Sequence, residues 1–343
     1  MALFGASFIS INYLASPPGQ RENEKKIVVD IPRGMGLRAI AKELEDAGII
    51  IEDKAFIIGV LIKGAKKKLK AGEYEFSTTS PLSAVIDKLV KGDVLIHRIT
   101  IPEGLTTKEI AGLLDSSGVV PKEEFLGEAS DKEFINELTQ AQAESLEGYL
   151  FPDSYSYKKG VTAEDFIRMI VGRFNEIYAP LKSNAAARRD LTDHEILTLA
   201  SIIEKETSIP EERPLISAVF YNRLKYGMRL QSDPTVIYGL EEFNGNLIKE
   251  DLKTETSYNT YVIHGIPPGP ICNPGKASLE AALEPAQSDY LYFVSRGDGT
   301  HEFSSNYRDH IKAVKKYQNP SGCKMQDAGY TIQDARCRMQ DTR

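Results

Sequence analysis

The chain has 343 residues, of which 41% are hydrophobic and 27% are charged, so it is long enough for two or three domains of ordinary globular composition. It carries 42 basic and 49 acidic residues, a formal charge of −7, and no basic stripe with interleaved aromatic residues. This balance argues against an extended nucleic-acid surface, and we expect no nucleic-acid partner. The cysteines, Cys272, Cys323 and Cys337, have neither metal-site spacing nor the even number of a disulfide framework.

The first residues form an uncharged segment, Ala2–Ala15, which breaks at Pro17 and Pro18 into a polar stretch. The segment is shorter than the roughly 20 residues that a membrane-spanning helix needs. No basic residue precedes it, so a signal peptide also fits poorly. We interpret residues 1–16 as the remnant of an N-terminal membrane anchor and residues 17–25 as a linker. An apolar first element of a soluble domain is the alternative.

An internal repeat marks the first third of the chain. Ile31-Pro-Arg-Gly34 matches Ile101-Pro-Glu-Gly104, and the apolar residues and glycines that follow each motif match as well. Each copy predicts a strand, a Pro-Gly turn and a helix that a glycine ends. Between the copies we expect helices around 54–62 and 82–91 and an alternating strand over 72–76.

These elements predict an α+β protein with a small βααβ module over residues 26–96. Strand-helix-helix-strand is the order of a LysM-like fold, which binds wall glycans, although a plain spacer or docking domain is the alternative. A larger mixed α+β domain is expected over residues 97–318. We expect the polar tail over residues 319–343 to be disordered, because it has few apolar residues and no helical pattern.

In the larger domain, apolar spacing predicts helices around 163–178, 193–205, 215–225 and 276–282, a strand over 290–294 and a last helix from Tyr307. The segments between them are rich in proline and glycine. Pro234 predicts an extended conformation at Asp233, because the residue before a proline avoids the helical region.

The helix expected over 193–205 carries the most informative pattern. Its apolar residues recur at the spacing of a helix buried on one face: Ile196, Leu199, Ile202 and Ile203. The next position on that face is Glu206. A carboxyl group at the end of an apolar stripe is partly desolvated, which raises its pKa toward the range useful for proton donation. A solvated helix end or an ion pair with an arginine is the alternative, and Glu204 on the neighbouring face is a second candidate.

Other reaction types lack their motifs in this sequence. There is no Gly-x-Ser-x-Gly elbow, no His-Glu-x-x-His zinc motif and no phosphate loop with a Gly-Lys-Ser end. Carboxylates among Gln, Asn, Tyr and Pro-Gly loops remain. This set of residues favours the cleavage of glycosidic bonds, in which a protonated carboxyl group helps the glycosidic oxygen leave.

A group of segments closely resembles the YceG-like (MltG) family, the endolytic murein transglycosylases of the bacterial inner membrane. In chain order they are Glu147–Asp153, Ala200–Thr207, Asn222–Leu224, Arg229–Gly239, Tyr258–Tyr261, Gly265–Pro270 and Tyr290–Val294. The resemblance runs from about residue 26 to residue 317. It implies a single-pass anchor in the inner membrane, a LysM-like subdomain and a catalytic domain in the periplasm or otherwise outside the membrane. The catalytic glutamate of the family falls on Glu206.

The resemblance implies a lytic transglycosylase that acts on nascent glycan strands, needs no cofactor and forms 1,6-anhydromuramyl ends. Glu206 would serve as both acid and base, and Glu204 would tune its pKa through like charge. We expect sugar and N-acetyl contacts from Glu147, Tyr149, Gln231, Asp233, Tyr258, Asn259 and Asn306. For each of these the alternative is a polar residue that satisfies its own loop.

Two other functions remain open at this point. A muramidase would hydrolyse the same bond through a water, and a membrane-tethered scaffold would bind wall glycan without reacting. The partners expected are glycan strands, the inner membrane and peptidoglycan synthases.

Overall fold

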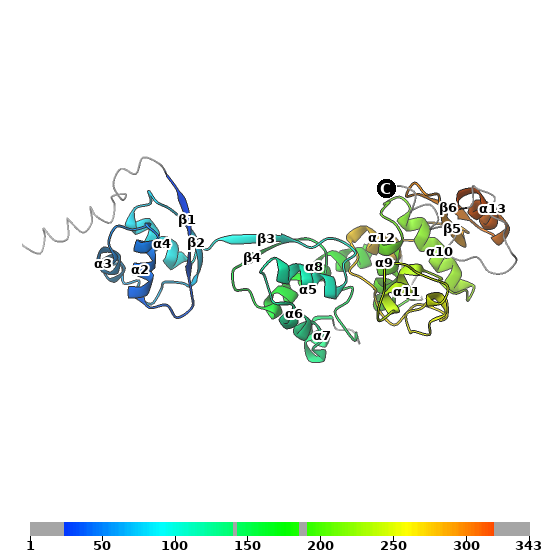
Figure 1. Cartoon of the computed structure of the whole chain (residues 1–343), viewed down its shortest axis with the longest axis horizontal. Coiled ribbons are helices and arrows are strands. Elements are labelled where there is room, and N and C mark those ends of the chain that lie inside the picture. The colour runs from blue at the N-terminus through cyan, green and yellow to red at the C-terminus, as the bar shows by residue number, and fades with distance from the viewer. Residues whose placement is uncertain (1–23, 140–142, 185–190, 319–343) are drawn as a thin grey trace, which may run out of the picture. The chain divides into compact units, whose positions relative to one another are not determined.

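The computed structural model describes residues 24–139, 143–184 and 191–318 (Figure 1). The predicted anchor, most of the predicted linker and the predicted tail lie outside these residues. Within them, no helix combines the length and the apolar character that a membrane span requires.

The chain divides into two compact units. Of the described residues, those at 24–99 and 155–161 belong to unit one, and those within 100–154 and 162–318 belong to unit two. Helices and small antiparallel sheets make up both units, which confirms the mixed α+β class. The domain limits predicted from the sequence stay predictions.

Unit one is built on one antiparallel strand pair. Strand β1 (Lys26–Ile31) pairs with β2 (Gly72–Ser77) so that Val29 lies opposite Tyr74. Around the pair pack helices α2 (Leu37–Asp46), α3 (Asp53–Ile62) and α4 (Leu82–Lys91). Alternate residues of both strands and the apolar stripes of the helices form one core: Val29, Ile31, Ile40, Leu44, Phe56, Tyr74, Phe76, Ile86 and Leu89. The strand-helix-helix-strand order is the predicted one, and the likeness to a LysM fold stays a prediction.

The sequence repeat is also a repeat of backbone conformation. Gly34 and Gly104, which end the two Ile-Pro-x-Gly motifs, have φ of 84° and 78°. Gly48 and Gly118, which follow the two helices, have φ of 71° and 66°. Glycine adopts these left-handed conformations without the steric cost that other residues incur. The repeated glycines therefore mark turns that the repeated helices need.

Two further strands, β3 (Ile96–Thr100) and β4 (Ser154–Lys158), form a second two-stranded sheet. The helices after β3 are α5 (Thr107–Ser116), α6 (Lys122–Ala129), α7 (Lys132–Thr139), α8 (Ala163–Asn184), α9 (Asp193–Glu206), α10 (Arg213–Lys225), α11 (Asp233–Gly239), the short 3-10 helix η1 (Asp251–Lys253) and α12 (Lys276–Leu283). The chain then forms an antiparallel hairpin of β5 (Tyr292–Ser295) and β6 (His301–Ser304), covered by α13 (Tyr307–Tyr317).

Helix α9 is the central helix of unit two. It begins after Thr192, whose side chain forms a capping box with Glu195. Every residue from Ile196 to Ile203 is buried, because α10, α11 and α12 all pack against it. The expectation of a single buried face was therefore wrong, although the residues of the predicted stripe are all in the core.

The turn before α11 corrects a second expectation. Asp233 is the first residue of α11, and the extended residue is Ser232, with φ −101° and ψ 121°. Pro234 lies in the first turn of the helix, where the missing N–H would have no helical partner in any case. The proline thus starts a helix here instead of extending the chain at Asp233.

Candidate active site

Glu206 is the last residue of α9, and the residue as a whole is half-buried. The Ser232 hydroxyl donates to Glu206 Oε1 at 2.5 Å, and no other protein group in the described residues hydrogen-bonds to this carboxylate. Burial raises the pKa of Glu206 to about 7. The hydrogen bond from Ser232 opposes this rise, while the charge of Asp233 adds to it. A carboxyl group with such a pKa populates both protonation states near neutral pH.

Ser232 is held in place by a buried cluster of hydroxyl groups. Its backbone N–H donates to Thr260 Oγ1 at 2.9 Å, and its carbonyl accepts from Thr235 Oγ1 at 2.6 Å. Thr235 and Thr260 also bond to each other at 2.8 Å, and all three residues are nearly inaccessible to solvent. The donor to Glu206 therefore has a fixed position.

Asp233 lies beside Ser232 in the first turn of α11. The Tyr261 hydroxyl donates to Asp233 Oδ1 at 2.7 Å. Because the negative charge of Asp233 disfavours a second charge on Glu206, Asp233 is the like-charged neighbour that raises the pKa of Glu206.

Arg223, on α10, connects three segments around this site. Its guanidinium donates to the Leu291 carbonyl and to the Leu230 carbonyl, each at 2.7 Å, and lies over the ring of Tyr292. It also donates to Gln231 Oε1 at 3.4 Å. Burial lowers the pKa of Arg223, and its positive charge lowers the pKa of Glu206.

Gln231 is exposed and lies directly before Ser232. With φ of +52°, it is the one non-glycine residue with positive φ in the described part of the chain. Its backbone N–H donates to the Thr260 carbonyl at 3.1 Å.

Glu204, the second candidate, has a different environment. Its carboxylate accepts from the Gly275 N–H at 3.0 Å and forms an ion pair with Arg213 at 3.5 Å, and both charged side chains are 7% exposed. Arg213 in turn donates to Ser278 Oγ at 3.0 Å. These contacts join the end of α9 to the start of α12. Glu204 is thus part of a buried structural ion pair, and the pKa-tuning role predicted for it falls to Asp233.

Glu147 and Tyr149 are buried, each about 5% exposed. Glu147 accepts from the Thr107 N–H at 3.0 Å, from Asn273 Nδ2 at 3.0 Å and from the Tyr238 hydroxyl at 3.3 Å. The Tyr149 hydroxyl bonds to His194 Nδ1 at 3.0 Å. Burial raises the pKa of Glu147 to about 7 and that of Tyr149 to about 12. Partners inside the protein satisfy both groups, which favours the alternative of a structural role.

The remaining predicted sugar contacts are Asn259, Tyr258 and Asn306, and they differ in burial and in hydrogen-bond partners. Asn259 is fully buried, and its amide donates to the Thr254 carbonyl at 2.7 Å, so it holds its own loop. Tyr258 is half-buried, with its ring 4.8 Å from that of Tyr238. Asn306 caps α13 by accepting from the Asp309 N–H, and no hydrogen bond in the described residues joins it to the surroundings of Glu206.

The structure therefore brings Glu206, Gln231 and Asp233 together out of the predicted set. Sequence reasoning missed Ser232, Arg223 and Tyr261. A serine before Asp-Pro is a signal for the start of a helix, so the cap position of Ser232 could have been found. Its place against Glu206, 26 positions away, has no local sequence signal.

The family model described as the YceG-like family matches residues 29–316. The chain belongs to the YceG-like family. This YceG-like protein is 34% identical to the endolytic murein transglycosylase of Bacillus subtilis (strain 168), over 92% of the chain and 91% of that relative. It is 30% identical to the endolytic murein transglycosylase of Streptococcus pneumoniae serotype 2, over 92% of the chain and 62% of that relative. A crystal structure of a yceG-like protein from Listeria monocytogenes shares 35% identity and gives a TM-score of 0.56, covering 84% of the chain and 99% of that structure.

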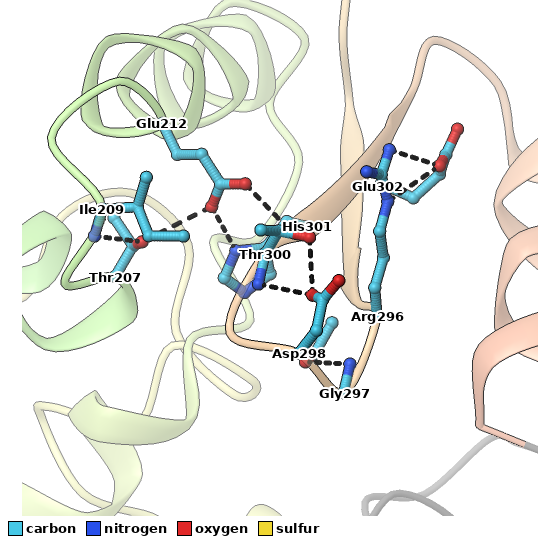
Figure 2. A network of polar contacts seen from close by, with 10 residues as sticks. Thr207, Ile209, Glu212, Arg296, Gly297, Asp298, Thr300, His301 and Glu302 are labelled. Atoms are coloured by element: carbon cyan, nitrogen blue, oxygen red, sulfur yellow. Dashed lines mark hydrogen bonds and ion pairs between the residues drawn. The ribbon is translucent and has the colours of Figure 1, made fainter.

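In this YceG-like protein a second polar network joins the end of α9 to the C-terminal hairpin (Figure 2). Glu212, just before α10, accepts from the His301 N–H at 2.8 Å and from His301 Nδ1 at 2.6 Å. The Thr207 hydroxyl, next to Glu206, donates to the same carboxylate at 3.4 Å. The network fixes the backbone that follows Glu206.

No group of three or more potential metal ligands gathers anywhere in the described part of this YceG-like protein.

Proposed function

We propose that this protein is an endolytic peptidoglycan lytic transglycosylase. It cleaves the β-1,4 bond between N-acetylmuramic acid and N-acetylglucosamine in nascent strands and leaves 1,6-anhydromuramyl ends. One observation carries the proposal: Glu206 has a pKa raised to about 7, and a single hydrogen bond from the protein occupies its carboxyl group. The names of the Bacillus and Streptococcus relatives support the same activity.

The reaction starts with Glu206 in its protonated form. It donates its proton to the glycosidic oxygen, the bond from that oxygen to the muramyl C1 breaks, and the oxygen leaves as the C4 hydroxyl of N-acetylglucosamine. Burial favours this protonated state, and the charge of Asp233 favours it further.

In the second step Glu206 is a carboxylate. It takes the proton of the muramyl C6 hydroxyl while the C6 oxygen bonds to C1, so the ring closes and no water is consumed. The hydrogen bond from Ser232 and the charge of Arg223 favour this ionised state. One carboxyl group acts twice, so no second catalytic carboxylate and no cofactor are needed.

The location and partners are part of the same proposal. The uncharged segment within residues 1–16 belongs to a single-pass anchor in the bacterial inner membrane, and the catalytic unit lies outside the membrane. Glycan strands are then within reach as they leave the peptidoglycan synthases, and cleavage at that point ends strand elongation.

The test is mass spectrometry of uncrosslinked glycan strands after incubation with wild-type and Glu206→Gln protein. Anhydromuramyl ends from the wild type alone are the expected result. Ends heavier by one water would assign a hydrolytic muramidase instead. Binding without any new ends would assign a wall-glycan scaffold.

A further inference from the structure

Gln231 combines a strained backbone with an exposed side chain at the edge of the Glu206 site. Its φ of +52° lies in the left-handed region, which residues with a Cβ occupy at a cost. A glycine at this position would avoid that cost. The described chain has glycine at every other position with positive φ, fourteen in all, so the exception at Gln231 needs a reason.

The contacts that impose this conformation also build the candidate active site. The Leu230 carbonyl on one side accepts from Arg223, and the Ser232 N–H on the other side donates to Thr260 Oγ1. Both flanks are therefore fixed by buried groups. The turn at Gln231 lies between these two fixed flanks and directly precedes Ser232, the donor to Glu206, but neither fact explains why the side chain is glutamine.

The orientation of the side-chain amide supplies the missing reason. A guanidinium group only donates hydrogen bonds, so Arg223 Nη1 at 3.4 Å from Gln231 Oε1 turns the amide oxygen toward the protein. The amide nitrogen then points away from Arg223, and no group in the described residues accepts a hydrogen bond from it. An exposed residue thus presents two N–H donors beside the Glu206 site.

We propose that Gln231 is a specificity-determining residue that donates its amide N–H to the acetamido carbonyl oxygen of a murein sugar. This inference rests on the proposed function and deepens it. A carbonyl oxygen is the strongest neutral acceptor on the glycan, and an amide held by Arg223 loses little freedom when it binds. Glutamine is present at the strained position because the ligand needs its donor.

The test measures binding, so that it does not depend on cleavage. All variants carry Glu206→Gln, and the probes are uncrosslinked glycan strands with their N-acetyl groups intact or chemically removed. Gln231→Gly removes the amide and the strain together. We expect this variant to bind acetylated strands about tenfold more weakly, the usual scale of one lost hydrogen bond. On de-N-acetylated strands the two proteins should bind equally, and the melting temperature of the glycine variant should be unchanged or higher.

Gln231→Asn is the matched control, because asparagine keeps an amide and tolerates the left-handed region. It should lose less affinity for acetylated strands than Gln231→Gly does. Equal loss of affinity on both kinds of strand, no loss on either, or a lower melting temperature of the glycine variant would overturn the assignment. Failure of the Glu206→Gln protein to bind either strand would overturn it too, whereas missing cleavage by the wild type would count only against the proposed function.

Discussion

Glu147 and Glu206 are two carboxyl groups of the same unit with the same pKa and different surroundings. Burial raises the pKa of each to about 7. Glu147 accepts hydrogen bonds from a backbone N–H at the start of α5, from Asn273 and from Tyr238. Glu206 accepts one, from Ser232. Only Glu206 has a carboxyl oxygen that accepts no hydrogen bond from the described residues.

The comparison shows that a raised pKa alone does not identify an acid/base catalyst. Donors surround the carboxylate of Glu147 and orient it toward a helix N-terminus, where a negative charge is favourable. Glu206 lies at the C-terminal end of α9, where the unpaired carbonyls disfavour a negative charge and desolvation adds to that effect. The number and direction of the hydrogen bonds separate Glu147, which has a structural environment, from Glu206, which we propose as the reactive group.

The largest effect is expected from Glu206→Gln. Loss of the proton donor should reduce the formation of anhydromuramyl ends by a factor on the order of 10²–10⁴. The rate of end formation, measured by liquid chromatography with mass detection, checks this. An activity within a factor of about three of wild type would remove Glu206 from the mechanism.

Glu206→Gln should also change stability with pH. The folded pKa of Glu206 is above its unfolded value, so its favourable contribution is complete below about pH 4.5 and is lost as pH rises through about 7. The variant should therefore match the wild type at low pH and exceed it at pH 8 by about 1–3 kcal/mol of unfolding free energy. Denaturant unfolding at both pH values measures this, and a variant less stable at pH 8 would contradict the desolvation of Glu206.

Glu147→Gln should cost stability and spare activity, the reverse of the pattern expected for Glu206→Gln. Its amide NH₂ would face donors, so the free energy of unfolding should fall by about 1–3 kcal/mol. The folded protein should keep its activity within a factor of about three. Thermal unfolding and initial rates of the same sample test this. A stable variant without activity would mean that Glu147 is the reactive carboxyl group.

His301→Gln tests a third buried carboxylate, Glu212, whose donors come mostly from His301. The variant keeps the backbone hydrogen bond and loses the ring, so the expected cost is about 1 kcal/mol of unfolding free energy. The rate of end formation by the folded protein should be nearly unchanged. A large loss of rate at unchanged stability would give the network in Figure 2 a catalytic role.

The smallest effects are shifts in pH dependence. Ser232→Ala removes the hydrogen bond that lowers the pKa of Glu206, so the alkaline limb of the rate profile should move to higher pH. Asp233→Asn removes a charge that raises this pKa, so the limb should move to lower pH. Each shift should be about one pH unit or less. Shifts in the same direction would contradict the assigned causes.

The sequence predicted what local patterns determine. Helix α4 was predicted with its observed bounds, and α9 and α12 each to within one residue, because apolar spacing and glycine stops act over a few residues. The same spacing singled out Glu206, since the stripe along α9 leads to it. The position of Glu206 at the end of that stripe was enough to predict its desolvation and its raised pKa.

The sequence could not predict contacts that cross irregular loops. Glu147 was predicted to contact sugar, but its partners Thr107 and Asn273, 40 and 126 positions away in the sequence, hold it in a buried position. Arg223, Ser232 and Tyr261 meet around Glu206 because three separate segments pack together. Neither the periodicity nor the composition of the sequence predicts that these segments pack together.

The most direct test is the pH dependence of anhydromuramyl end formation by wild-type and Glu147→Gln protein. Two carboxyl groups share a pKa of about 7, and we assign the reaction to Glu206 alone. We expect a rate profile with a limb near pH 7 in both proteins, because Glu206 is intact in each. Loss of that limb in Glu147→Gln would show that the titrating group of the reaction is Glu147.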